Sequence, residues 1–315
     1  MTTQVLIMFP YSGFEKGHKR ETLFWDLVNS CQNDEQKPIV VLNRDTEKRD
    51  NAKAFLEDSR STKDVCIHRC WAVDTCQMWL SGWGYILDQP TTSNNDRIVQ
   101  LPGDIDTVTS DRFFNELDAF INHGGNHDIV IGDFTSEDMF SAKELIDLYG
   151  TYALMANWFP DVAQACRQDS SKALEQDKTP RKKFFKLNRL RSEFLNIRVG
   201  TLNSLLNNRK FAYEQTLNML IRSWDHMAKD WKYKVTKMDL GVVTDDSSSR
   251  KYQDCLDQIE RTERMLKLLW REIYGSSYSN QQEFIDTYDL LDQHSTSIRE
   301  NARIIIRNIL GLGPR

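Results

Sequence analysis

The chain has 315 residues, of which 40% are hydrophobic and 28% charged, and its formal net charge is −5 at pH 7. This length allows one large α/β domain with an appendage, or two small domains. The acidic balance disfavours a general nucleic-acid or membrane-surface binder, because phosphate groups attract positively charged proteins. No apolar run has the length of a membrane span and no basic-then-apolar leader opens the chain, so we expect a cytoplasmic protein.

Apolar runs and amphipathic segments alternate along the first part of the chain. The runs are continuous and short, as in strands buried on both faces of a parallel sheet. We expect strands at 5–9, 38–42 and 65–68 and helices at 19–30, 47–60 and 74–87. This alternation predicts an α/β fold, with a mainly parallel sheet covered by helices on both faces.

Ligands of such sheets bind beyond the carboxyl ends of the strands. Pro10, Tyr11 and Ser12 follow the first expected strand, and Asn43 follows the second. We therefore predict that these four residues contact a bound ligand.

The stretch from Arg97 to Val108 carries the strongest chemical signal. It begins as an apolar strand, stops at Pro102-Gly103, and then presents Asp104 and Asp106. Alternate residues of an extended segment point the same way, so both carboxylates can bind one hard cation, Mg²⁺ or Mn²⁺, that keeps open sites for phosphate oxygens. This pattern predicts a nucleotide-sugar site, although an Asp-x-Asp also occurs in surface turns.

The middle of the chain continues the alternation. We expect helices at 110–123, 141–158 and 211–227, and strands at 128–132 and, as a half-exposed edge, 233–238. Between them, six basic residues fall within 181–191, ending at Arg191. This segment is either a solvated loop or a mobile cationic cover for a diphosphate or an anionic acceptor.

The last quarter is predicted to be an antiparallel pair of helices. Two apolar stripes have residues three and four apart, and a turn at 275–280 separates them. We expect the stripes to pack within the molecule, with a homo-oligomer interface as the alternative. The expected division is therefore a first domain at 1–250 and a helical hairpin at 251–315.

The six cysteines form no Cys-x-x-Cys pair, and their spacing matches no structural zinc pattern. We expect reduced, mostly buried thiols. The histidine between two of them, His68, is expected to be structural.

Four short motifs resemble a known family. They are the Phe9-Pro10-Tyr11 opening, the Asp-x-Asp after the fourth expected strand, Phe211-Ala212-Tyr213-Glu214, and the strand ending Asp239-Leu240-Gly241. Together they look like the GT-A glycosyltransferases, and most like the group of glucosyl-3-phosphoglycerate synthase and mannosylglycerate synthase. The likeness extends over about residues 4 to 250.

The resemblance implies an activity and a set of roles. The enzyme would transfer a hexose from a UDP- or GDP-sugar to a small organic-acid or sugar acceptor and would retain the anomeric configuration. Asp104 and Asp106 would hold the metal ion, Asp106 most directly, and Asp245 would stand where relatives have a metal-binding histidine. Glu193 would lie near the donor sugar and Glu214 near the acceptor or sugar.

Two other classes of function use the same residues differently. A nucleotidyltransferase would use the same sheet and carboxylates. Such an enzyme usually has a glycine-rich loop with a lysine or arginine after its first strand, and this sequence lacks that loop. A non-catalytic assembly protein would use the helical hairpin as its interface. Binding of nucleoside diphosphates with Mn²⁺ would separate an enzyme from an assembly protein.

Overall fold

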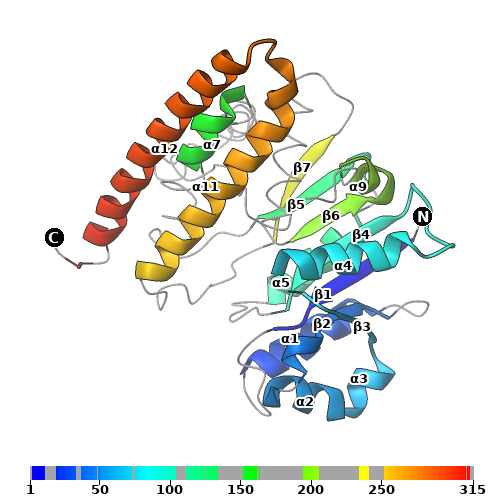
Figure 1. The fold of residues 1–315 in the computed structure, drawn as a ribbon. Helices are drawn as coiled ribbons and strands as arrows, with labels where there is room; N and C mark the ends of the chain where they lie inside the picture. The colour runs from blue at the N-terminus through cyan, green and yellow to red at the C-terminus, as the bar shows by residue number, and fades with distance from the viewer. Residues whose placement is uncertain are drawn as a thin grey trace, which may run out of the picture. The chain divides into compact units, whose positions relative to one another are not determined.

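The computed structural model divides into two compact units, which we call the sheet unit and the helical unit (Figure 1). The described residues of the sheet unit are 2–10, 19–32, 37–47, 49–72, 75–103, 111–123, 125–133, 194–205 and 234–240. Those of the helical unit are 152–161, 163, 252–309 and 311–312.

The sheet unit is built on seven strands in the order β3-β2-β1-β4-β6-β5-β7. They are β1 (Thr3–Met8), β2 (Ile39–Asn43), β3 (Cys66–Cys70), β4 (Arg97–Pro102), β5 (Ile129–Asp133), β6 (Leu195–Arg198) and β7 (Val235–Asp239). All neighbours pair in parallel except β6, which is antiparallel to β4 and β5. The predicted α/β class with a mainly parallel sheet is therefore confirmed, and the expected edge strand is β7.

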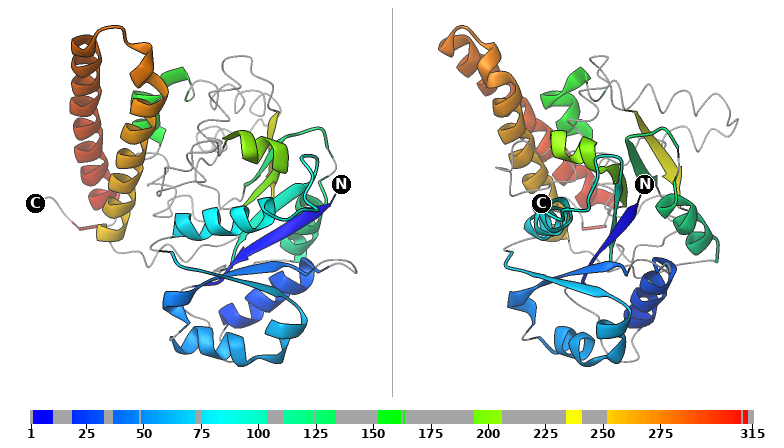
Figure 2. Two further views of the ribbon diagram at one scale, coloured as in Figure 1. Left: turned by 45° about the vertical axis from the view of Figure 1, so that its right-hand side comes forward. Right: turned by 90° about the vertical axis from the view of Figure 1, so that its right-hand side faces the viewer.

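Helices cover both faces of this sheet, as predicted. On one face, α1 (Lys19–Ser30) and α5 (Asp111–Ile121) contribute aromatic side chains to a core that contains every second residue of β1. On the other face lies α4 (Thr75–Leu87), where a Cβ on Gly82 would come within 2.9 Å of the Val41 side chain. Figure 2 (right) shows α4 on one side of the strands and α1 with α5 on the other.

The antiparallel strand β6 was not predicted. It is four residues long, and α9 (Val199–Leu205) follows it at once. Its Asn196 is fully buried, donating to the Phe120 carbonyl (2.6 Å) and accepting from Arg97 Nε (2.5 Å). Burial, and then the nearby Arg198 guanidinium, lower the Arg97 pKa to about 10. Long-range partners of this kind, rather than local pattern, define the strand.

The predicted helix at 47–60 is wrong in one respect, because it is interrupted. A short 3-10 turn, η1 (Arg44–Thr46), precedes α2 (Asp50–Glu57), and α3 (Ser59–Lys63) is a separate helix. Asp58 between them is extended and accepts a hydrogen bond from the Arg60 amide (2.9 Å). Aspartate is a strong N-cap, so its side chain begins a new helix instead of continuing the old one.

The helical unit contains α7 (Ala153–Trp158), α11 (Tyr252–Tyr274), the turn η5 (Gly275–Ser277) and α12 (Gln281–Ile309). The predicted antiparallel pair is confirmed as α11 and α12. The predicted first domain, ending at residue 250, included the segment 141–158. Its described part, α7, packs instead against both C-terminal helices and ends before Pro160.

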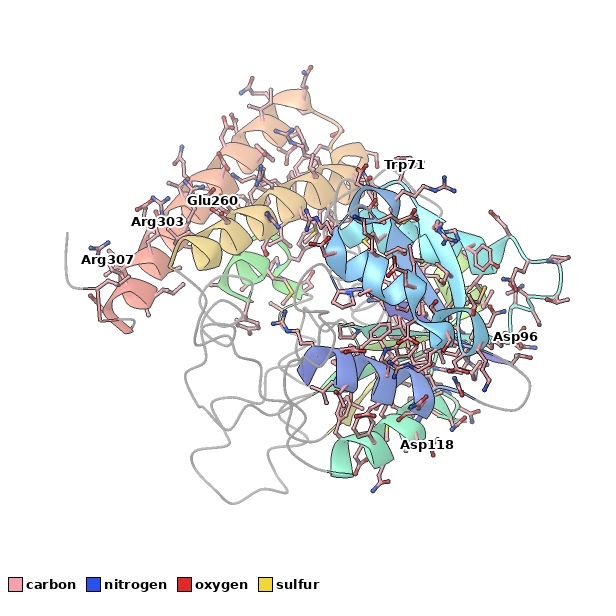
Figure 3. The ribbon with its side chains drawn as sticks, turned by 90° about the horizontal axis from the view of Figure 1, so that it is seen from below. Trp71, Asp96, Asp118, Glu260, Arg303 and Arg307 are labelled. Atoms are coloured by element: carbon pink, nitrogen blue, oxygen red, sulfur yellow. The ribbon has the colours of Figure 1, made fainter. Side chains whose placement is uncertain are left out.

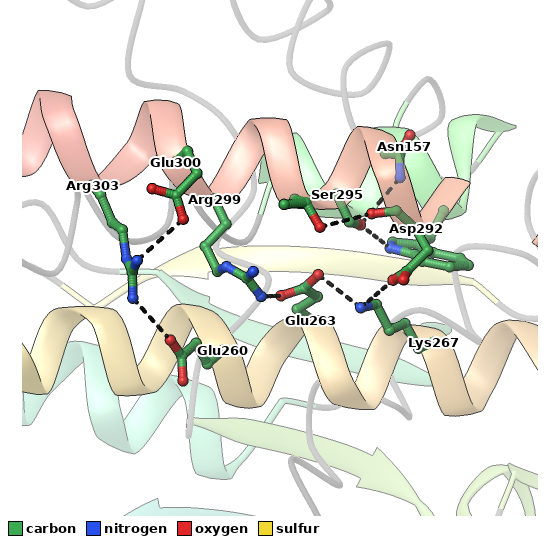
Figure 4. Close-up of polar contacts among 11 residues, drawn as sticks. Asn157, Glu260, Glu263, Lys267, Asp292, Ser295, Arg299, Glu300 and Arg303 are labelled. Atoms are coloured by element: carbon green, nitrogen blue, oxygen red, sulfur yellow. Dashed lines mark hydrogen bonds and ion pairs between the residues drawn. The ribbon is translucent and has the colours of Figure 1, made fainter. Parts of the chain in front are cut away.

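A line of charged residues joins α11 to α12 (Figure 4). Glu263, only 2% exposed, accepts from Arg299 Nη1 at 2.8 Å and pairs with Lys267 Nζ at 2.9 Å. Lys267 also pairs with Asp292. Beside them, Arg303 bridges Glu260 (3.4 Å) on α11 and Glu300 (3.1 Å) on its own helix.

The third helix, α7, is tied to α12 by polar and aromatic contacts. Trp158 Nε1 donates to the buried Ser295 hydroxyl (2.5 Å), and Asn157 Nδ2 donates to the Leu291 carbonyl (2.9 Å). The Trp158 ring also lies edge-on to Trp270 of α11, with 5.9 Å between centroids. One tryptophan therefore contacts both helices.

Candidate functional site at the carboxyl edge of the sheet

The parallel strands β1, β2, β3 and β4 end at one edge of the sheet. In their register Met8 of β1 is opposite both Val41 of β2 and Pro102 of β4, and Asn43 is opposite Cys70 of β3. The chain order reverses at β1, because β2 and β3 lie on one side of it and β4 on the other. In open α/β sheets this reversal opens a crevice at the carboxyl ends, where ligands bind.

Gly103 holds the ends of β1 and β4 together. A Cβ at this position would collide with the Met8 carbonyl oxygen and stand 3.3 Å from the Phe24 ring. Glycine is therefore required for the backbone after β4 to cross this close to the end of β1. The next residue in sequence is Asp104, so the Asp-x-Asp begins directly beyond this contact.

Asn43, predicted to bind a ligand, has a structural role at this edge. The side chain is 4% exposed, and its Nδ2 donates to the Ala72 carbonyl at 2.6 Å. Its Oδ1 accepts from the amides of Asp45 (3.2 Å) and Ala72 (3.4 Å). The amide thus fastens the chain that follows β3 to the end of β2.

Pro10 is the other predicted site residue that the structure describes, and it is buried two residues after the end of β1. The remaining predicted residues lie outside the described part of the chain: Tyr11, Ser12, Asp104, Asp106, Arg191, Glu193, Glu214 and Asp245. Their roles stay predictions. The structure describes the ends of β1 and β4. In the sequence, Tyr11 and Ser12 follow β1, and Asp104 and Asp106 follow β4.

Two residues at this edge were not predicted. Trp71 follows β3 directly and is 70% exposed (Figure 3). The Arg44 guanidinium, just after β2, lies over its ring at 5.9 Å from the centroid. Arg69 pairs with Glu47 at 3.0 Å, joining the same two strand ends. The signal in the sequence was a tryptophan placed immediately after a strand.

The cysteines behave as predicted where they are described. Cys31, Cys66 and Cys70 are free thiols, and burial raises the pKa of Cys31 and Cys70. His68 bonds the Ser81 hydroxyl of α4 through Nε2 (2.8 Å), and burial lowers its pKa. These contacts fasten β3 to α4, so the structural role predicted for His68 is supported.

Among the described residues, no group of three or more histidine, cysteine, aspartate or glutamate side chains is arranged to hold a metal ion. The carboxylates predicted for that task, Asp104, Asp106 and Asp245, are not among those residues. By their chemistry, aspartate oxygens suit Mg²⁺ or Mn²⁺, and in the sequence the Asp-x-Asp follows Gly103 at the end of β4.

The chain matches no protein-family model and no curated protein. None of the described helices combines the length and apolar content that crossing a membrane requires. What the chain shares with other α/β proteins is a mixed, mainly parallel sheet of the Rossmann-like kind followed by C-terminal helices.

Proposed function

We infer that the protein is a metal-dependent glycosyltransferase of GT-A type. It moves a hexose from a nucleoside-diphosphate sugar to a small anionic acceptor and retains the anomeric configuration, as the sequence resemblance implies. The observation that carries this proposal is the position of the Asp-x-Asp. It starts one residue after Gly103, where β4 ends beside β1 at the reversal of strand order.

This position suits diphosphate chemistry. Asp104, Asp106 and Asp245 would hold Mg²⁺ or Mn²⁺, which when bound neutralises the charge of the donor diphosphate. The crevice would place the donor across the ends of β1 and β4. Arg191 and its basic neighbours in sequence would pair with diphosphate oxygens through charge-assisted hydrogen bonds.

The reaction exchanges one bond to the anomeric carbon for another. The bond to the diphosphate oxygen breaks, and its electron pair leaves with the nucleoside diphosphate. The acceptor hydroxyl oxygen bonds to the anomeric carbon and loses its proton. Glu193, near the donor sugar, and Glu214, near the acceptor, are the carboxylates proposed to orient the two substrates and to take up charge or the proton.

Metal-dependent nucleotide binding tests the proposal. We expect UDP or GDP with Mn²⁺ to raise the melting temperature of the parent protein, because a ligand at 100 times its Kd stabilises the folded state by about 2.7 kcal/mol. Asp106→Ala should abolish that shift and leave the melting temperature without ligand unchanged. Asp118→Ala is the matched control, because Asp118 is an exposed carboxylate on α5 (Figure 3).

An equal Mn²⁺-dependent shift in the parent and in Asp106→Ala would remove the Asp-x-Asp from the site. If no nucleotide raised the melting temperature of the parent protein, the result would favour the assembly-protein alternative. A donor-hydrolysis screen over UDP- and GDP-sugars would then identify the sugar and the base in a protein that does bind.

A further inference from the structure

Trp71 is exposed although the other described tryptophans are in the core. Its side chain is 70% exposed, whereas Trp25, Trp79, Trp83, Trp158 and Trp270 are at most 4% exposed. Leaving an indole in water forgoes the largest hydrophobic gain that any side chain offers. An exposed tryptophan that is held in place is therefore a candidate contact for a ligand.

The backbone at Trp71 is held on both sides. Cys70, before it, is the last residue of β3 and is paired in register with Asn43. Ala72, after it, accepts through its carbonyl from Asn43 Nδ2 and donates through its amide to Asn43 Oδ1. An indole on a fixed backbone loses little conformational freedom when a partner stacks on it.

Arg44 leaves one face of the Trp71 ring for a ligand. Its guanidinium lies over the indole at 5.9 Å from the centroid, within the range of a cation–π contact. A side chain that is 70% exposed with a cation over one face has its other face available to solvent. The pair therefore offers a flat aromatic surface beside a positive charge.

The position of this surface selects the kind of ligand. In the order β3-β2-β1-β4 the end of β3 lies three strand spacings from the end of β4, about 14 Å measured across the strands, and two residues further along. An extended nucleoside diphosphate has a planar base at one end and its diphosphate at the other, which suits this separation. A sugar ring with a single phosphate is shorter, and a base of any identity can stack on an aromatic face.

We propose that Trp71 stacks on the base of the nucleoside diphosphate, and that Arg44 steadies the indole from the opposite face of the ring. This inference rests on the proposed function, since it assigns the base-binding end of the same site. It makes Trp71 a binding residue for the donor, while Asn43 positions it.

The test compares a nucleotide with its base-free counterpart. Isothermal titration with Mn²⁺ would measure the Kd of UDP, GDP and inorganic pyrophosphate for the full chain and its variants. Trp71→Ala should weaken UDP or GDP by about tenfold or more, the loss expected for one base stacked on an aromatic ring. The Kd of pyrophosphate should stay the same, and Trp71→Phe should recover most of the nucleotide affinity.

Tyr85→Ala is the matched control. Tyr85 is also an exposed aromatic residue, but it lies on α4 against His68 and Cys66, the latter at the opposite end of β3. Its removal should leave both affinities unchanged.

The outcomes separate this inference from the proposed function. If the parent bound neither nucleotides nor pyrophosphate with Mn²⁺, the proposed function would fail and this inference with it. If the parent bound nucleotides and Trp71→Ala bound them equally well, only the stacking would be overturned. Equal losses for nucleotide and pyrophosphate would also overturn it, because Trp71 would then support the fold or the metal side of the site.

Discussion

The two units bury their side chains in different ways. In the sheet unit, all five residues of β2 are buried and the main core cluster is apolar, while buried polar residues such as Asn43, Arg97 and Asn196 are held by hydrogen bonds. In the helical unit, α11 and α12 meet through aromatic side chains, such as Trp270 on Phe284, and also through charged residues, of which Glu263 is only 2% exposed.

The difference follows from the geometry of the elements. A strand covered on both faces satisfies its backbone through its neighbours, so its side chains can all be apolar and its polar residues gather where it ends. A pair of helices shares only one stripe, and the charged residues along that stripe must pair with each other across it. Candidate chemistry is therefore expected at the strand ends, while the charges between α11 and α12 serve structure.

The largest effect is expected from a charge placed in the apolar part of the α11 stripe. Ile259 is fully buried, so Ile259→Asp should destabilise the protein by on the order of 5 kcal/mol, the cost of an unpaired buried charge after relaxation. Leu268→Asp on the same helix is the control, since Leu268 is 45% exposed. Urea unfolding measures both. Equal stability of Ile259→Asp and the parent, with a changed mass in solution, would make the stripe an oligomer interface.

Glu263→Ala tests whether the charged contact between the helices is structural. Its removal leaves Lys267 and Arg299 facing each other without their shared carboxylate, so we expect a loss of about 3 kcal/mol. Glu300→Ala removes a half-exposed partner of Arg303 and should cost less than about 1 kcal/mol. Similar small losses in both variants would break the contrast between the units, because the buried pair would then contribute no more than a surface pair.

Gly103→Ala tests the contact that organises the strand ends. The added Cβ must displace the Met8 carbonyl, so the variant should lose about 1–3 kcal/mol and its Mn²⁺-dependent nucleotide binding should weaken. Gly84→Ala is the control, because a Cβ there meets nothing within 4 Å on a helix, where alanine is favoured by about 0.5–1 kcal/mol. Unchanged nucleotide affinity in Gly103→Ala would show that the nucleotide site does not lie at this edge of the sheet.

The smallest effect is expected from the histidine pair at the opposite edge of the sheet. His123 Nε2 and His127 Nδ1 are 3.2 Å apart, so one nitrogen must donate and the other accept. Burial, followed by the charges of Arg97 and His127, lowers the His123 pKa below its ordinary 6.5. The folded state then binds fewer protons than the unfolded state, so this stability is complete above pH 6.5 and declines as the pH falls through the folded pKa.

His123→Asn should flatten that decline by less than about 1 kcal/mol, because the ring is partly exposed and its charge is screened. Urea midpoints between about pH 5 and pH 8 cover the titration of histidine. His294→Asn, at an exposed position of α12, is the matched substitution control. A profile that stayed equally steep in His123→Asn would assign the pH dependence to another group.

For the site, sequence and structure contribute different parts. The Asp-x-Asp was predicted as a metal site because local features mark it: an apolar strand, a Pro-Gly stop, and two alternating carboxylates. Arg44 and Trp71 were missed because a single residue after a strand, even a tryptophan, does not show what it will contact. They come together only when β2 and β3 pair side by side, which brings the residues after each strand into contact.

The sequence alone determined the α/β class, the places where β1, β2 and β4 end, and the two helical stripes of α11 and α12. These features are periodic over a few residues, so they depend on local side-chain spacing. Only the tertiary structure decided that β6 runs antiparallel between β4 and β5, that α7 packs with the C-terminal helices, and that Gly103 must lie against Met8. Each of these rests on contacts between residues far apart in the chain, and no local pattern records which distant partner will be buried against which.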